Sequence, residues 1–215
     1  MSSDLISRRD LLFKAALSLA ALNFGCSISK LAGDREGNTA LIYATKYGAT
    51  KDTAGWIRNG IDGEVDLLDI EDISFTRTAK GYGSFIVGSG VWIGGVHNKL
   101  LDFLTSQAEI LDGKVIASFV VCGTDGSTES GKKRIDGYFN QFHAPLKTMP
   151  LLSEYFGGRI VVEKLTEEDR EALIKFYRTF LKSELTSWDK TDPDKAGRFG
   201  NEAARLLLTS QTNAQ

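Results

Sequence analysis

The chain has 215 residues, of which 42% are hydrophobic and 25% charged, a composition typical of a globular protein with one sizeable core. Lysine and arginine number 26 against 28 aspartates and glutamates, so the formal net charge of −2 provides no broad basic surface, and we expect no nucleic-acid partner. Two cysteines and two histidines are too few for a disulfide framework or a zinc cage, so we expect no metal site.

The first segment is typical of an export signal. Arg8 and Arg9 precede an apolar run over 15–24, which is too short to span about 30 Å of hydrocarbon. The arginine pair resembles that of a twin-arginine leader, which directs proteins to an export route that moves them already folded. We therefore predict a signal segment over 1–29 and an exported, periplasmic protein. The alternative is an apolar or amphipathic docking helix with two incidental arginines. Lipid anchoring at Cys26 is less favoured, because the preceding residues lack the usual lipobox spacing.

From Thr39 onward, short apolar runs alternate with helical segments, a pattern typical of strand-helix-strand units around a parallel sheet. Five strands in this rhythm predict an α/β protein with a doubly wound sheet and helices on both faces, whose ligands lie at the carboxyl ends of the strands. The predicted strands are 41–43, 64–68 (an edge strand), 84–87, 114–121 and 159–162, and the predicted helices are 50–59, 97–105, one that begins near Lys133, and 201–208.

The turn after the first strand has the chemistry of a phosphate-binding loop. Thr45 and Thr50 flank Gly48 where a strand leads into a helix, so backbone N–H groups, hydroxyls and the positive helix end meet there. The spacing matches neither the dinucleotide turn nor the P-loop. The alternative is a plain turn that Thr50 caps. The candidate cofactor-binding residues of this turn are Thr45, Lys46, Tyr47, Gly48, Ala49 and Thr50.

The segment 41–57 resembles the FMN-phosphate signature of the flavodoxin family. The resemblance implies a five-stranded parallel sheet in the order 2-1-3-4-5 and FMN as the cofactor. Lys46 and Tyr47 stand where small flavodoxins have hydroxyl residues, and Ala49 where they usually have asparagine, so fewer hydroxyls can reach a phosphate, although Lys46 can supply charge instead. The signature positions are matched by Leu41, Ile42, Tyr43, Thr45, Gly48, Thr50 and Ala54.

Two further loops correspond to the loops that hold the flavin ring in flavodoxins. Glycines after the third strand let backbone approach a flat ligand closely. The run over 88–97 looks most like the corresponding loop of menaquinone-dependent protoporphyrinogen dehydrogenases, and that resemblance extends over about 39–125. The cofactor-binding residues that it implies are Ser89, Gly90, Val91, Trp92, Ile93 and Gly94, with Cys122, Gly123, Thr124 and Asp125 after the fourth strand.

Three side chains near these loops have alternative roles. Trp92 either stacks on the flavin ring or packs between loops. Cys122, at a buried strand end, is expected to be inert packing rather than a redox thiol. His97 is expected to begin the next helix, with a proton-relay role as the alternative.

The segment 166–198 is longer than a usual loop, and we expect a helical insertion within a flavodoxin-like domain over 38–212. Thr166, followed by three acidic residues, is typical of a helix start. Apolar residues between Leu173 and Leu181 then fall on one helical face. This face either packs on the domain or forms a platform for a membrane quinone, a membrane surface or a partner protein.

These features predict an exported FMN-binding redox protein in which the flavin carries the chemistry, so no catalytic side chain is assigned. One hypothesis is an oxidoreductase related to protoporphyrinogen dehydrogenase that passes electrons to a quinone. The second is a non-enzymatic electron carrier between redox proteins. A flavin-free binding protein on the same fold is the third. An export leader disfavours haem synthesis, whose substrate is expected in the cytoplasm.

Overall fold

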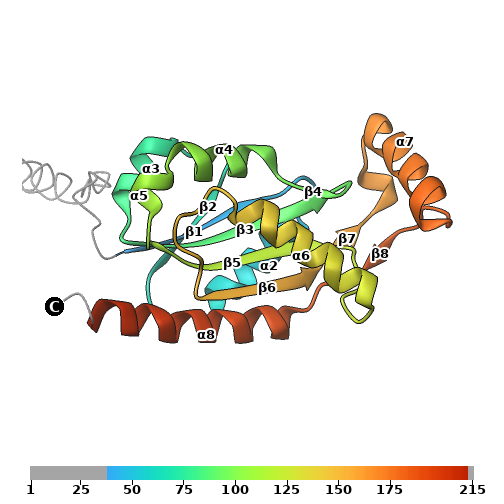
Figure 1. The fold of residues 1–215 in the computed structure, drawn as a ribbon. Coiled ribbons are helices and arrows are strands. Elements are labelled where there is room, and N and C mark those ends of the chain that lie inside the picture. Colours follow the sequence, from blue (N-terminus) through green and yellow to red (C-terminus); the bar gives the residue numbers. More distant parts are fainter. Residues whose placement is uncertain (1–37, 213–215) are drawn as a thin grey trace, which may run out of the picture. The chain divides into compact units, whose positions relative to one another are not determined.

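The computed structural model describes residues 38–212, which fold around a mainly parallel β-sheet (Figure 1). The sheet has the order β2-β1-β3-β5-β6, which confirms the predicted α/β fold and the predicted 2-1-3-4-5 order. A short strand, β4 (Gly95–Val96), pairs antiparallel with the end of β3. The predicted signal segment and Cys26 lie outside the described residues. The parallel strands are β1 (Thr39–Ala44), β2 (Val65–Asp69), β3 (Ser84–Trp92), β5 (Val115–Cys122) and β6 (Leu152–Gly157).

The fifth strand of the sheet lies earlier in the chain than predicted, so the prediction of 159–162 was wrong. β6 lies at the edge of the sheet, and exposed Ser153 and half-buried Glu154 stand in the same strand as buried Phe156, so it lacks a continuous apolar run. Arg159–Ile160 instead forms β7, which pairs antiparallel with β8 (Trp188–Asp189). The apolar side chains of Ile160 and its neighbour Val161 line a cavity rather than the core of the sheet.

Helices cover both faces of the sheet, as predicted (Figure 1). Successive side chains of β1 point to opposite faces of the sheet, so Ile42 belongs to the core cluster on one face and Leu41 to the cluster on the other. The first cluster includes residues of α3 (Phe75–Gly81), α4 (Asn98–Ser106), α5 (Ala108–Leu111) and α6 (Glu129–His143), and the second includes residues of α2 (Ala49–Asn59) and α8 (Pro193–Thr212).

Two predicted helix starts were too late in the sequence. α6 begins at Glu129 rather than near Lys133, because the Thr128 hydroxyl caps it by accepting a hydrogen bond from the Gly131 N–H at 3.0 Å. α8 begins at Pro193 rather than at 201. Half of its buried stripe consists of alanines, which weaken the apolar pattern, and its members are Ala196, Phe199, Ala203 and Leu207.

Glycines bring α2 and α8 into backbone contact. A Cβ on Gly60 would lie 2.2 Å from the carbonyl oxygen of Gly197, and a Cβ on Gly200 would lie 2.1 Å from that of Ile57. Such distances exclude any side chain at Gly60 or Gly200 unless the helices separate. α8 is therefore seated closely against α2 on one face of the sheet.

Between β6 and α8 the chain forms a projection that we call the cap, residues 159–192. α7 lies beyond the carboxyl ends of β3 and β5, next to the β3–β4 hairpin (Figure 1). The Thr166 hydroxyl accepts a hydrogen bond from the Asp169 N–H, which confirms the predicted helix start. Within the described residues, no helix has the length and apolarity needed to cross a membrane. The cap contains β7, η1 (Val162–Lys164), α7 (Glu167–Phe176), the π-helical η2 (Tyr177–Leu181) and β8.

Candidate functional site

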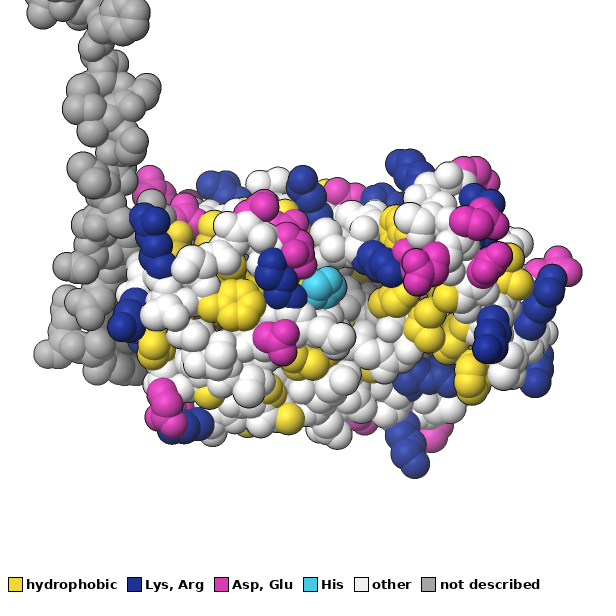
Figure 2. Space-filling view, turned by 90° about the horizontal axis from the view of Figure 1, so that it is seen from above, with side chains coloured by type: hydrophobic (Ala, Val, Ile, Leu, Met, Phe, Trp, Pro, Cys, Tyr) yellow, Lys and Arg dark blue, Asp and Glu magenta, His cyan; other side chains and the backbone are white. Residues whose placement is uncertain are grey.

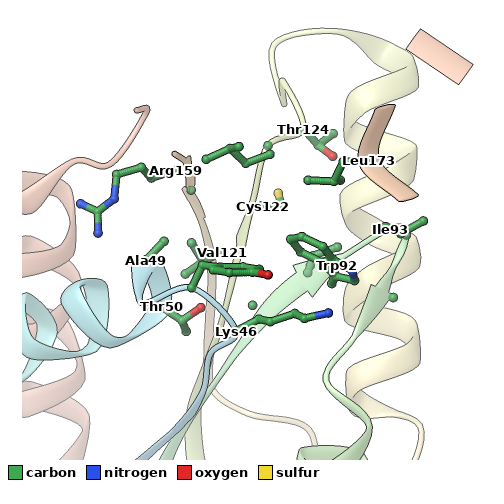
Figure 3. A pocket seen from close by; sticks show the side chains of 18 of the residues that line it. Lys46, Ala49, Thr50, Trp92, Ile93, Val121, Cys122, Thr124, Arg159 and Leu173 are labelled. Atoms are coloured by element: carbon green, nitrogen blue, oxygen red, sulfur yellow. The ribbon is translucent and has the colours of Figure 1, made fainter. Parts of the chain in front are cut away.

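A cavity of about 660 Å³ opens at the carboxyl ends of the central strands, between the sheet and the cap (Figure 3). Four segments supply most of its lining: the turn before α2, the β3–β4 hairpin, the turn after β5, and the cap. Arg134 and Tyr138 of α6 also contribute. On the face shown in Figure 2, hydrophobic side chains gather at the cap end, beside a hollow. Cavities of about 300–1,000 Å³ are typical of small-molecule sites.

The structure brings most of the predicted cofactor-binding residues together around this cavity. Gly48 does not line it, but its φ of 89° makes the turn that leads into α2. Ser89 is fully buried and its hydroxyl accepts a hydrogen bond from the His97 N–H at 2.9 Å. Asp125 is exposed, and its carboxylate accepts one from the Ser127 N–H. The lining includes Thr45, Lys46, Tyr47, Ala49, Thr50, Gly90, Val91, Trp92, Ile93, Gly94, Cys122, Gly123 and Thr124.

The N-terminus of α2 faces the cavity without a side-chain cap. The alternative in which Thr50 only caps this helix does not hold, because Gly48 occupies the cap position and the helix already includes Thr50. The Thr45 hydroxyl accepts a hydrogen bond from the Gly48 N–H at 3.0 Å and so closes the turn. Thr50 is 2% exposed, and a Cβ on Gly90 would lie 2.8 Å from its hydroxyl oxygen. A helix N-terminus with a buried hydroxyl beside it suits a phosphate.

Lys46 and Tyr47 contact the cap. The Lys46 ammonium lies 2.6 Å from the Asp169 carboxylate and 4.5 Å from the centre of the Trp92 ring. The Tyr47 hydroxyl donates a hydrogen bond to Asp169 and accepts one from the Thr166 N–H at 3.2 Å. Lys46 extends away from Ala49 and Thr50 in Figure 3. Its charge is therefore matched by a carboxylate of the cap.

The segment predicted as a glycine-rich loop is largely a β-hairpin. β3 continues to Trp92, and the chain turns through Ile93 and Gly94, which have φ values of 45° and 87°. The Trp92 ring lies 5.5 Å from that of Tyr47, at an interplanar angle of 39°. Trp92 thus packs against the turn before α2 and also lines the cavity.

The turn after β5 approaches the cap closely. A Cβ on Gly123 would lie 2.9 Å from the Trp188 ring, whose N–H donates a hydrogen bond to the Tyr177 hydroxyl at 2.7 Å. Burial raises the pKa of the Cys122 thiol, and bonds with Thr124 offset only part of that increase. Burial therefore favours the thiol form, and the inert role of Cys122 stays a prediction.

His97 stands at the N-cap of α4, as predicted, and lines the cavity. Its Nε2 lies 4.0 Å from a carboxylate oxygen of Glu71. Its Nδ1 is buried and has no hydrogen-bond partner in the part of the chain that the structure describes. A proton-relay role for His97 stays a prediction.

Sequence reasoning missed the contribution of the cap to this cavity. Arg159 donates a hydrogen bond to Asp52, in the first turn of α2, at 2.6 Å, and its guanidinium points away from the cavity (Figure 3). That bond, together with the charges of Asp52 and Asp189, raises the pKa of Arg159. The apolar pattern after Thr166 was the available signal. The cap residues in the lining are Arg159, Ile160, Val161, Leu165, Leu173, Phe176, Tyr177, Leu181 and Trp188.

Comparisons with known proteins find one family model and several similar solved structures. The profile of a family described as flavodoxin domain matches residues 40–184. Similar solved structures include a flavodoxin from the domain Archaea, with 18% identity over 80% of this chain and 99% of that chain and a TM-score of 0.45. Flavodoxin 1 from Bacillus cereus has 22% identity over 69% of this chain and 99% of that chain and a TM-score of 0.39. No curated protein matches the chain.

Part of a larger protein is also similar to this chain. The Flv1 flavodiiron core from Synechocystis sp. PCC6803 has 17% identity over 94% of this chain and a TM-score of 0.49. The match covers 41% of the flavodiiron chain, so this chain corresponds to less than half of that protein.

Proposed function

The chain belongs to the flavodoxin domain family, and from that premise we propose that it binds FMN in the cavity beneath the cap and transfers electrons through the flavin. FMN is the usual cofactor of this family. The observation that carries the proposal is the convergence of the uncapped α2 N-terminus and the buried Thr50 hydroxyl on one cavity of about 660 Å³. When bound, the flavin supplies the redox chemistry, and the protein binds and orients it.

Residues of three segments would hold the cofactor. Backbone N–H groups of the first turn of α2, with the hydroxyls of Thr45 and Thr50, would bind the phosphate. The β3–β4 hairpin with Trp92 and the turn over 122–124 would hold the ring. Apolar side chains of the cap would exclude water from the space beside it. Lys46 and Arg159 already pair with carboxylates, so neutral donors carry much of the phosphate binding.

The absorption spectrum of the purified protein tests this function. We expect a yellow protein that releases FMN rather than FAD, because one helix N-terminus provides one phosphate site. Colourless protein should take up added FMN, and riboflavin should bind more weakly because it lacks the phosphate. A protein that neither carries nor takes up FMN in a flavin-fluorescence titration would disprove the proposal.

We further propose that the protein is exported and that its electrons pass to a quinone or to a partner redox protein. The paired Arg8 and Arg9 support export. The apolar cap lining beside the ring-binding hairpin supports an oxidoreductase with a small apolar substrate, related to the menaquinone-dependent protoporphyrinogen dehydrogenases. Exposed Phe180 and Leu181 at the end of η2 favour the second candidate, a carrier that docks on a protein. Steady turnover with a small donor and a quinone supports the first, and electron exchange only with proteins supports the second.

A further inference from the structure

Asp169 is a buried carboxylate that connects the cap to the turn before α2. It lies in the first turn of α7 and is 8% exposed, whereas the neighbouring Glu168 is exposed. Its two oxygens accept hydrogen bonds from Lys46 at 2.6 Å and from the Tyr47 hydroxyl. Burial alone would raise the pKa of Asp169, but these bonds and the Lys46 charge outweigh burial and hold the pKa below its usual value.

The two partners of Asp169 both contact Trp92. The Lys46 ammonium lies over the Trp92 ring, 4.5 Å from its centre, and the Tyr47 ring lies 5.5 Å from the same ring. All three side chains line the cavity. Asp169 therefore determines where a cation and two aromatic rings stand on one wall of the site. A second ion pair, from Arg159 to Asp52, fastens the base of the cap to α2.

We propose that Asp169 is a positioning residue for the cofactor site: it holds the cap closed on the phosphate-binding turn and balances the charge of Lys46 beside the Trp92 wall. The inference rests on the proposed FMN function. Two effects follow. Loss of the carboxylate releases the cap, so that bound FMN escapes faster. It also leaves the Lys46 charge unbalanced, and a cation in the cavity favours the addition of electrons to the flavin.

The variants are Asp169→Asn, which removes the charge and keeps the shape, and Lys46→Gln, which removes the opposite charge. Glu168→Gln is the matched control, because it removes an exposed carboxylate from the same helical turn and changes the helix-dipole interaction similarly. Asp169→Glu keeps the carboxylate on a longer side chain, so it tests whether the charge alone is enough to hold the cap closed and to balance Lys46.

The first measurement needs no flavin. Trypsin cleaves after the basic residues of the cap, such as Arg170 and Lys175, so the digestion rate of the flavin-free protein reports release of the cap. We expect Asp169→Asn to be cleaved about tenfold faster than wild type, the effect of losing a hydrogen bond to a charged group, and Glu168→Gln to be unchanged. Equal rates for Asp169→Asn and Glu168→Gln would overturn the closing role.

The second measurement uses protein loaded with FMN. Asp169→Asn should release FMN about tenfold faster and raise the midpoint potential, whereas Lys46→Gln should lower the potential and the double variant should return close to wild type. A purely structural role would move both single variants in the same direction, and that result would overturn the charge-balancing role. If wild type takes up no FMN, the proposed function fails, while the digestion rates still decide whether Asp169 closes the cap.

Discussion

Thr50 places a single hydroxyl at the point where the phosphate is expected. Thr50→Val keeps the shape and removes the hydrogen bond, so we predict that FMN binds more weakly by about 1–3 kcal/mol, the range for a bond to a charged group. Flavin-fluorescence titration measures the difference. The control is Thr53→Val, because Thr53 is equally buried in α2 and its hydroxyl donates to the Ala49 carbonyl rather than facing the cavity. Equal FMN affinity in the Thr50→Val variant and wild type would show that this hydroxyl does not bind the cofactor.

Trp92 is the large aromatic side chain of the β3–β4 hairpin, where the flavin ring is expected. Trp92→Ala should shift the midpoint potential of the bound flavin, because it opens one wall of the cavity to water and leaves Lys46 without its aromatic neighbour. The free energy of unfolding should fall by less than the roughly 3–5 kcal/mol of a fully buried aromatic, because Trp92 is only half-buried.

Trp56→Ala is the control for that variant, because Trp56 is also half-buried but lies in α2 outside the cavity lining. It should lower the stability without moving the potential. If Trp92→Ala leaves the potential unchanged and lowers the stability strongly, Trp92 serves only to pack the two loops together.

At the scale of residues, the turn before α2 could be predicted because the residues that form it lie close together in the sequence. Thr45, Gly48 and Thr50 occur together in the sequence, so a local pattern was sufficient. The partner of Lys46 could not be predicted in this way, because Asp169 lies 123 residues further along the chain. Its acidic neighbours made it look like an ordinary residue of a helix start, and only the folded cap shows that it is buried.

At the scale of elements, the α2–α8 contact depends on the absence of side chains. Gly200→Ala should lower the free energy of unfolding by about 1–3 kcal/mol, the usual cost of overpacking, because the new Cβ meets the backbone of Ile57. Gly55→Ala is the control, since a Cβ at Gly55 meets nothing within 4 Å, and it should be neutral or stabilising by up to about 1 kcal/mol. Denaturant unfolding measures both, and a Gly200→Ala protein at least as stable as wild type would contradict the packing argument.

The doubly wound parallel sheet could be predicted from the alternation of apolar runs and helical segments, because buried parallel strands such as β5 are almost entirely apolar. The order of its strands was implied by the resemblance to flavodoxins. The edge strand β6 could not be predicted, because Ser153 and Glu154 interrupt its apolar pattern. The continuous apolar run that follows β6 belongs to the cap, and its side chains, such as Ile160 and Val161, line the cavity instead of packing in the sheet. A run of apolar residues thus indicates burial without saying in which layer.

At the scale of the whole molecule, the paired arginines predict the export route. Changing Arg8 and Arg9 to Lys should leave the folded protein inside the cell, because the receptor reads the arginine pair rather than the charge. The control replaces two exposed arginines of the folded domain, Arg58 and Arg77, by Lys. Fractionation of cells measures the result, and an equal periplasmic yield of the Arg8 and Arg9 variant would exclude this route.

The close packing of α8 on α2 also determines when the domain can finish folding. Phe199 packs its ring on Phe119 and Phe156, and the glycines of α8 meet the backbone of α2, which is the first helix of the domain to be synthesised. A nascent chain that ends before Pro193 lacks the helix that completes this face of the sheet, so the α2–α8 contact forms only after α8 has left the ribosome. An export channel that passes only unfolded chains would require the α2–α8 contact to break again. An export route that carries folded proteins would leave this contact intact.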